Sequence, residues 1–332
     1  MLFLPIILKH NFYRQISTNS NHNNDSSVYP FYIKNINKFL GIFIGLIDGD
    51  GYIEIGPQKQ YSTNSNSKYH TQSTIRSRIV LRLHAKYLEL LNLFANILKI
   101  GKIDELKSKN QYRLIIHKTD TFNIIYPFLV GQLTNNNIEF LNYNRRKQFF
   151  LLKYIIENNL KYWEDINLNK INNLFVESNK KLEFTDIINL PYFNNWLLGF
   201  TVAEGSFHIK ARGMAHFSIV KSDIENSPII KAIHYFIKGP ESLNYHIKPE
   251  NSKVYRISFS SKKDLNFIIN FCDNNFLGLK KLQFDNWKAY INSHIKASAP
   301  NVILDKRSNN FTINNTNKNI DKFQNNSKND SK

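Results

Sequence analysis

The stretch FLGIFIGLIDGDGYIEI, residues 39–55, recurs in a looser form as WLLGFTVAEGSFHI, residues 196–209. Each copy reads as an apolar helix, an acid, a glycine and then a short strand. The acids Asp50 and Glu204 fall at equivalent places, 154 residues apart. Internal repetition of this kind predicts two similar halves within one chain.

Small residues mark one face of each repeated helix. Gly41, Gly45 and Gly49 are spaced by four and therefore share a face. Each glycine inside a helix costs about 0.5–1 kcal/mol relative to alanine, so a compensating gain is needed. The second copy has Asn195, Gly199 and Ala203 at the same spacing. We predict that the two helices pack backbone to backbone through Gly41, Gly45, Gly49, Gly199 and Ala203.

The segments after the two copies also match in kind, because each half reads as helix, hairpin, helix, hairpin, helix. In the first half we predict strands at 51–56, 74–83, 100–107 and 111–117, and helices at 87–98, 119–130 and 138–157. In the second half we predict strands at 205–212, 214–221, 242–249 and 253–259, and helices at 225–238, 262–272 and 279–294. This order predicts an α+β fold of two pseudo-symmetric αββαββα halves, each with a four-stranded antiparallel sheet, packed through the two repeated helices.

The expected division of the chain follows from this pattern and from composition. We predict a disordered or targeting leader at 1–35, a first half at 36–157, a connector at 158–190 and a second half at 191–296. The remainder, 297–332, is rich in asparagine and has few apolar residues to bury, so we predict a disordered tail.

The acid at the end of each helix suggests a metal site. Gly51 and Gly205 suit the position just past a helix end, where φ is often positive. Asp50 and Glu204 then lie at the negative end of the helix dipole, and they crowd each other if the helices pack side by side. A divalent cation relieves both penalties, and carboxylate, phosphate and water oxygens are the ligands that Mg²⁺ prefers. We therefore expect Asp50 and Glu204 to hold Mg²⁺, with Mn²⁺ as the alternative, for phosphodiester hydrolysis.

The residues FIGLIDGDG, 43–51, and LLGFTVAEG, 197–205, resemble the signature of the LAGLIDADG family of homing endonucleases and intron maturases, in its two-motif, single-chain form. The resemblance covers about residues 36–295. It implies that the motif helices form the interface between the halves and that Asp50 and Glu204 bind the catalytic metal. It also implies two curved, saddle-shaped sheets that grip the major groove. The implied activity of the monomer is metal-assisted hydrolysis of one phosphodiester per strand at a long double-stranded DNA site, which promotes mobility of an intron or reading frame.

Members of this family often carry a lysine near the end of each half that helps to activate water. The segment FLGLKKLQFDNW, 276–287, resembles that region, so the resemblance gives this catalytic role to Lys280, with Lys281 or a solvated surface lysine as alternatives. In the first half the stretch QLTNNNIEF, 132–140, places Asn136 or Asn137 where the lysine is expected. We therefore hypothesise that the two strands are cut at unequal rates.

Two further residues of this region have distinct interpretations. Lys221, at the end of a predicted strand, is another catalytic candidate near the metal. Asp48 has Val202 as its counterpart, and residues two apart lie on different helix faces. We interpret Asp48 as a helix-end or interface residue rather than a ligand.

The charge of the chain points to a polyanionic partner. The 332 residues carry a formal net charge of +18, with 44 Lys and Arg against 26 Asp and Glu. Several predicted strands alternate apolar with basic residues, and such a ribbon can enter the major groove, which is wide enough for two strands. Glu54 points outward as well and could accept a hydrogen bond from cytosine. We predict DNA contacts from Tyr52, Glu54, Arg76, Arg78, Arg82, His208, Lys210 and Arg212.

Other classes are weighed against this interpretation. The single cysteine, Cys272, excludes a disulfide framework and a cysteine-based zinc module. No apolar run approaches the roughly 20 residues of a membrane span, and we expect no membrane partner. The residues before Asp25 are basic, contain serine and lack acids, which is typical of a mitochondrial presequence and predicts a mitochondrial location, with an unstructured leader as the alternative.

Three alternative functions stay open from the sequence. The first is an RNA maturase that assists splicing of a group I intron, with or without DNA cleavage. The second is a non-catalytic DNA-binding regulator, which the acid kept in both motifs argues against, since a pure binder gains from removing negative charge near phosphate. The third is a membrane-surface protein, which is disfavoured because the basic residues are spread over strands and helices alike.

Overall fold

The computed structural model describes residues 36–58, 73–133, 137–178, 182–240, 249–251, 254–273, 275–276 and 278–298. The predicted leader and almost all of the predicted tail lie outside the described residues, as does most of the strand predicted at 242–249. Among the described residues no helix is both long and apolar enough to span a bilayer.

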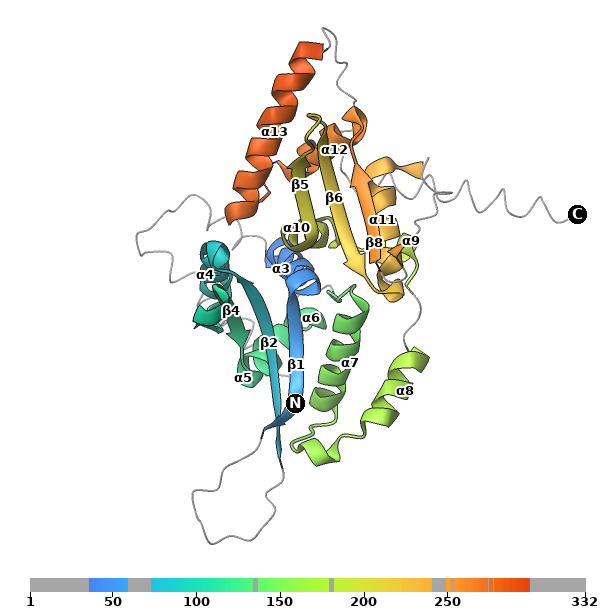
Figure 1. Cartoon of the computed structure of the whole chain (residues 1–332). Coiled ribbons are helices and arrows are strands. Elements are labelled where there is room, and N and C mark those ends of the chain that lie inside the picture. The colour runs from blue at the N-terminus through green and yellow to red at the C-terminus, as the bar shows by residue number, and fades with distance from the viewer. Residues whose placement is uncertain are drawn as a thin grey trace, which may run out of the picture.

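Both halves have the predicted order of elements, which confirms the α+β class and the two pseudo-symmetric halves (Figure 1). The first half contains α3 (Ile36–Asp50), β1 (Gly51–Gln58), β2 (Thr74–His84), α4 (Leu88–Leu98), β3 (Lys102–Leu106), β4 (Gln111–Ile116), the short helices α5 (Lys118–Asp120) and α6 (Tyr126–Leu129), and α7 (Tyr143–Glu157). The second half contains α10 (Phe193–Glu204), β5 (Gly205–Ile209), β6 (Ala215–Ser222), α11 (Ser227–Lys238), β7 (Pro249–Asn251), β8 (Val254–Phe259), α12 (Lys262–Cys272) and α13 (Gly278–Ser298). Helices α8 (Leu168–Ser178) and α9 (Phe184–Ile188) connect them.

The two sheets have the same topology, and the register of β1, β2 and β4 matches that of β5, β6 and β8, whereas the β7–β8 pair contains a register shift. Their strand orders are β1-β2-β4-β3 and β5-β6-β8-β7, and all neighbours are antiparallel. Gly51 pairs with Leu81 in the first sheet, and Gly205 pairs with Ile219 in the second. Residues 205–209 of β5 therefore correspond to residues 51–55 of β1, and residues 215–222 of β6 correspond to residues 77–84 of β2.

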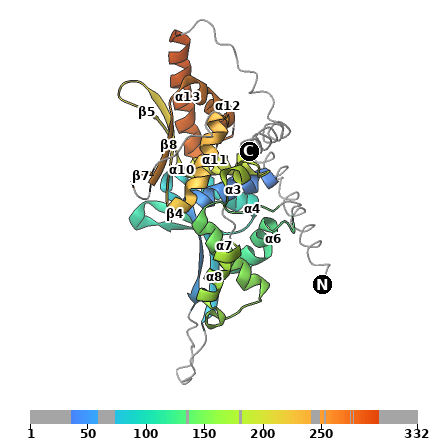
Figure 2. The ribbon, with the colours of Figure 1, turned by 90° about the vertical axis from the view of Figure 1, so that its right-hand side faces the viewer.

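Alternation along the strands gives each sheet one covered and one open face. On β2, Ile79, Leu81 and Leu83 are buried in the core, whereas Arg76, Arg78 and Arg82 on the opposite face are partly exposed. Figure 2 shows helices α6, α11 and α12 on one side of the molecule and the strands on the other. Helices α3 and α10 lie between the two sheets, and one continuous apolar core includes residues of both halves.

Two predicted elements have different boundaries, for local reasons. Helix α7 begins at residue 143 rather than 138, because Asn142 caps it by accepting hydrogen bonds from the amides of Asn144 (3.0 Å) and Arg145 (3.4 Å). The strand predicted at 205–212 ends at Ile209, because the chain turns through Gly213, whose φ is +80°. Arg212 therefore lies in an exposed turn and not on a strand face with His208.

Candidate active site

Helices α3 and α10 approach so closely that their backbones touch. A β-carbon built on Gly45 would lie 2.0 Å from the carbonyl oxygen of Trp196, and one on Gly199 would lie 1.9 Å from that of Ile42. One on Gly49 would lie 2.2 Å from Cβ of Ala203. The contact is reciprocal, so each helix supplies a glycine for the carbonyl of the other. This packing brings the last residues of the two helices together at one end of the interface.

Those last residues are the two predicted ligands, Asp50 and Glu204. Gly51 and Gly205, which follow the two acids, were expected to be glycine because of a positive φ, but the structure gives a different reason. Gly205 has φ −73°, which is open to any residue, but a β-carbon there would lie 2.5 Å from the carbonyl oxygen of Thr201. A β-carbon on Gly51 would lie 2.8 Å from Cα of Ile47. Space, not a positive φ, therefore selects glycine at both helix ends.

The Asp50 carboxyl is electrostatically disfavoured as an anion. The surrounding protein raises its pKa to about 6, and the neighbouring Glu204 adds to this effect, while Lys221 and Lys280 oppose it. Its side chain nevertheless opens to solvent on one side. The carboxylate accepts no hydrogen bond from the described residues. Asp50 is thus an accessible acid that the two lysines stabilise only through space, without a hydrogen bond from the described part of the chain.

Two lysines from the second half lie at this acid pair. Lys221 on β6 forms an ion pair with Glu204 (Nζ to Oε1, 2.5 Å) and donates to the carbonyl oxygen of Asp48 (3.3 Å). Lys280 on α13 is buried and donates to the carbonyl oxygen of Gly205 (2.8 Å). Burial lowers the pKa of Lys280, and the two acids partly offset that effect.

The alternative to Lys280 lies elsewhere. Lys281 is exposed and pairs with Asp285 one turn further along α13 (2.5 Å). Lys280 is therefore the lysine of this segment that lies near the acids, bonded to the backbone of Gly205 beside Glu204.

The first half has a different residue where Lys280 stands in the second. Arg145 and Lys280 are each the third residue of their helix, α7 and α13, and in both helices a glutamine follows three residues later and a phenylalanine four residues later. The counterpart of Lys280 is therefore Arg145, which corrects the expectation of Asn136 or Asn137. Asn136 lies outside the described residues, and Asn137 is exposed in the loop before α7. The equivalence was not recognised from the sequence because α7 was predicted to begin at residue 138, five residues before its actual start.

The counterpart of Lys221 differs as well. Lys221 lies two residues after Ile219, and Leu83 lies two residues after Leu81, which has the same register in the first sheet. Leu83 is buried in the core. Both lysines near the acids thus come from the second half, whereas the first half supplies an arginine and a leucine at the matching positions.

Asp48 joins the two halves beneath the acids. Its fully buried carboxylate accepts hydrogen bonds from the amide of Leu141 and from the indole Nε1 of Trp196, both at 2.7 Å. Burial raises its pKa to about 7, although these hydrogen bonds act in the opposite direction. Its contacts are those of an interface residue, as interpreted from its unlike counterpart Val202. The sequence pattern did not indicate Leu141 and Trp196 as the hydrogen-bond donors to Asp48, because both lie far from it in the sequence.

The acid pair fits a hard divalent cation that completes its shell elsewhere. Among the described residues no group of three or more His, Cys, Asp or Glu could enclose a metal ion. Mg²⁺ typically keeps several waters and takes one or two carboxylates together with substrate phosphates. The unpartnered carboxylate of Asp50 beside Glu204 matches that requirement. The residues that would hold the ion are therefore these two acids.

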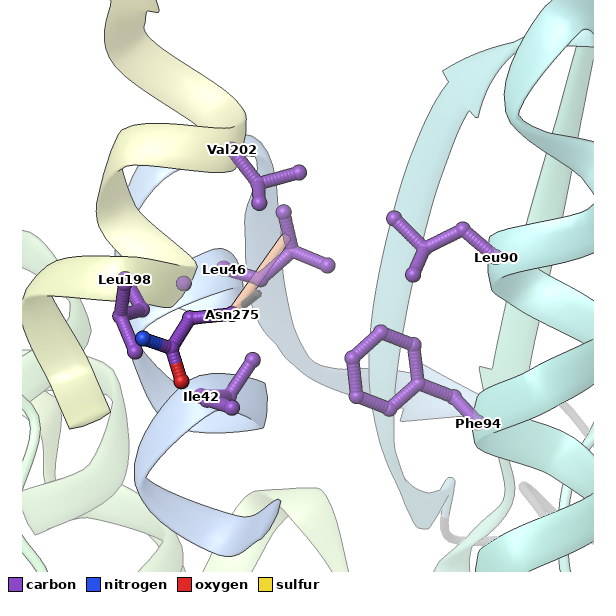
Figure 3. A pocket seen from close by; sticks show the side chains of 8 residues that line it. Ile42, Leu46, Leu90, Phe94, Leu198, Val202 and Asn275 are labelled. Carbon is purple, nitrogen blue, oxygen red and sulfur yellow. The ribbon is translucent and has the colours of Figure 1, made fainter. Parts of the chain in front are cut away.

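An apolar hollow lies nearby on the helix interface but lacks the chemistry of a site. Its walls come from α3, α10 and α4, and Asn275 is its one polar side chain (Figure 3). In Figure 3, Ile42 and Leu46 face Leu90 and Phe94 across the gap. The hollow carries no titratable group, so we interpret it as imperfect packing between α4 and the central helices.

The predicted DNA-contacting residues lie mostly on the open faces of the sheets. Those of the first half are on β1 and β2. In the second half His208 is on β5, its ring stacked on that of His216 on β6 at 5.5 Å between centroids. Lys210 is exposed at the start of the turn that also contains Arg212. His216, Arg113 and Arg256 share these faces and were missed, although their strand alternation could have indicated them.

Two halves with one sheet topology, joined through glycine-packed helices that each end in an acid, define a single-chain pseudo-dimer with a paired-carboxylate centre. The sequence pattern of the LAGLIDADG endonuclease family matches residues 43–145 and 197–291, so each half contains one match. The chain belongs to the LAGLIDADG endonuclease family.

Its relatives and structural neighbours are of the same kind. The chain is 27% identical over 271 residues to the probable intron-encoded endonuclease Cox1-I1b of Schizosaccharomyces pombe, covering 75% of this chain and 63% of that protein. It is 26% identical to the intron-encoded DNA endonuclease aI3 of Saccharomyces cerevisiae, covering 59% of this chain and 42% of that protein. The chain therefore spans less than two thirds of these relatives.

Solved structures agree with the fold. The LAGLIDADG homing endonuclease I-LtrWI bound to target DNA has a TM-score of 0.58 at 19% identity, over 79% of this chain and 92% of that one. The meganuclease I-CpaMI bound to uncleaved DNA has a TM-score of 0.55 at 18% identity, over 77% and 92% of the two chains.

Proposed function

We propose that this protein is a site-specific homing endonuclease that hydrolyses one phosphodiester in each strand of double-stranded DNA. The observation that carries the proposal is the position of Asp50 and Glu204 at the touching ends of α3 and α10, between two sheets with open faces. A nuclease needs acids where a phosphate backbone can reach them, and a pure DNA-binding protein gains nothing from placing acids there.

Each residue at this centre has a distinct part in the proposal. Asp50 and Glu204 would hold Mg²⁺, or Mn²⁺ in its place, and such an ion would supply polarisation of the phosphodiester and activation of water. Lys280, which burial and its hydrogen bond to the carbonyl oxygen of Gly205 hold in place, helps to orient and activate water near the scissile bond. Lys221 neutralises Glu204 before DNA binds and then stabilises negative charge on the phosphate.

The form of the substrate follows from the fold and the charge. Two sheets of the same register give one protein two adjoining half-site readers, so we propose a long, asymmetric DNA site and a monomeric enzyme. The net charge of +18 supplies the phosphate contacts. The names of the two curated relatives describe them as intron-encoded, which supports intron mobility as the biological outcome and, through the Cox1 gene in the first name, a mitochondrial location.

The test is a selection of cleaved sites from a randomised duplex library in Mg²⁺. The intact protein is compared with Asp50→Asn, Glu204→Gln and the control Glu89→Gln, which removes an exposed acid on α4. We expect cut sites to accumulate with the intact protein and the control, to be absent with both acid variants, and to disappear in EDTA. Cleavage by Asp50→Asn at an undiminished rate would show that the assignment is wrong.

A library left uncut in both Mg²⁺ and Mn²⁺ rejects the nuclease proposal as a whole. The maturase alternative then becomes the next hypothesis, and splicing of a group I intron RNA with added protein is its assay.

A further inference from the structure

Arginines on the open face of the first sheet are held by an acid on the neighbouring strand. Glu54 on β1 contacts Nε of Arg78 through Oε2 at 2.7 Å and Nη2 of Arg76 through Oε1 at 2.8 Å. Glu54 and Arg78 are direct cross-strand partners in the register, and Arg76 lies two residues away on the same face. Both carboxylate oxygens of Glu54 thus contact arginines of β2, while its predicted contact with cytosine stays a prediction.

The bodies of these arginines are also fixed to the sheet. Val80 and Ile115 pair across β2 and β4 on this open face, yet both are buried, with 1% and 2% of their surfaces exposed. The Nε atoms of Arg76, Arg82 and Arg113 are themselves buried. Arg82 and Arg113 pair next to Val80 and Ile115 on the same face, where long aliphatic stems can shield apolar residues from water.

This arrangement prepares Arg78 to contact a base edge. Because Nε is bound by Glu54, the two terminal nitrogens of Arg78 remain for a ligand, and a guanidinium fork of this kind matches O6 and N7 of guanine. An arginine already held in one orientation loses less side-chain entropy on binding, so the contact is stronger and more dependent on the base.

The second sheet has a different pair at the same register. His208 takes the place of Glu54 and His216 the place of Arg78, as the pairing of Gly51 with Leu81 and of Gly205 with Ile219 shows. The two imidazoles stack on each other at 5.5 Å. Burial lowers the pKa of His216, with Lys210 and His208 adding to the effect. A stacked pair of imidazoles offers no guanidinium fork.

We infer that Glu54 is a positioning residue that holds Arg78 and Arg76 for guanine in the half-site under the first sheet, and that the second half-site has no such guanine requirement at the equivalent place. The inference rests on the proposed function, since it names the base that one part of the DNA site must contain. It assigns different recognition chemistry to two halves that share a fold.

The experiment selects bound duplexes from a randomised library at fixed salt, using Ca²⁺ in place of Mg²⁺ to limit cleavage. The proteins are the intact chain, Glu54→Gln, Arg78→Lys and the control Glu89→Gln, which makes the same charge change on α4. The readout is the base preference at each position of the enriched sequence and the binding constant for duplexes changed at one base pair.

With the intact chain and the control, we expect guanine at one or two positions of one half-site, favoured about 5- to 150-fold over other bases. Glu54→Gln and Arg78→Lys should each remove most of that preference at those positions and leave all other positions unchanged. A merely structural role for Glu54 would instead weaken binding to every sequence alike.

Two results separate the inference from the proposed function. If no sequence is enriched by the intact chain, site-specific DNA binding itself is wrong. If a sequence is enriched but Glu54→Gln keeps the same guanine preference, or the preference lies equally in both half-sites, the inference about Glu54 is overturned while the endonuclease proposal stands.

Discussion

Replacement of Gly199 by alanine is the most direct test of how the two halves are joined. The added β-carbon would lie 1.9 Å from the carbonyl oxygen of Ile42, and ordinary contact begins at 3.4 Å. The helices must therefore separate by about 1.5 Å, because the added β-carbon and the backbone carbonyl of Ile42 are both fixed to their helices and cannot move aside as a flexible side chain could. Overpacking of this kind costs about 3 kcal/mol or more, and the better helix propensity of alanine returns about 1 kcal/mol. We expect a net loss of about 2 kcal/mol.

The same displacement changes the distance between the two acids, because Glu204 lies five residues after Gly199 on the same helix. A shift of about 1 Å at a catalytic centre can reduce the rate about 100-fold, so we expect cleavage to fall by at least that factor. The assays are urea unfolding followed by fluorescence and cleavage of a selected duplex under single-turnover conditions.

Gly56→Ala is the matched stability control. Gly56 lies on β1 with nothing within 4 Å of an added β-carbon, so the same substitution should leave the unfolding midpoint unchanged or raise it slightly. The reasoning is refuted if Gly199→Ala unfolds within about 0.5 kcal/mol of the intact protein and cuts DNA at a normal rate.

Three further outcomes follow from the acids and their neighbours. The pKa of Asp48 in the folded protein is raised to about 7, so folding takes up a proton and the contribution of Asp48 to stability declines as the pH rises from about 4 to about 7. Relative to the intact protein, Asp48→Asn should therefore gain about 2 kcal/mol of stability in urea unfolding between pH 5 and pH 8. A stability difference that is the same at both pH values would contradict this. Lys280→Met should slow cleavage of end-labelled duplex about 100-fold with unchanged DNA affinity, and equal losses in both measurements would show that the lysine only binds DNA. Because Arg145 replaces the lysine in the first half, the intact enzyme should nick supercoiled plasmid before linearising it. Arg145→Lys should shorten the lifetime of the nicked plasmid. If the intact enzyme never accumulates nicked plasmid, the two sites do not cut at unequal rates.

The central helices and the sheets were predictable because their signals are local or repeated. Glycines spaced by four identified the contact face of α3, and the second copy of the pattern located its partner α10. Alternation of Ile79, Leu81 and Leu83 with the arginines of β2 gave the open face of the first sheet. Each of these inferences needed information from one segment and its copy.

Features that depend on contacts between distant segments were not predictable in the same way. The partners of Asp48 are Leu141 and Trp196, which lie 93 and 148 residues away. Arg145 became recognisable as the counterpart of Lys280 once the cap at Asn142 fixed the first turn of α7. Pairing of Glu54 with Arg78 depends on strand register, which the sequence alone left open.

The reciprocal glycine contact also has a consequence for the order in which the chain is made. Helix α3 is buried along nearly its whole length, yet Gly199, which seats against it, is synthesised about 150 residues after Gly45. At about 5–20 residues per second, the ribosome leaves α3 without that partner for about 8–30 s. During this interval an apolar helix lacks part of its core, so the nascent first half exposes an apolar surface that can aggregate, and slower translation prolongs that exposure.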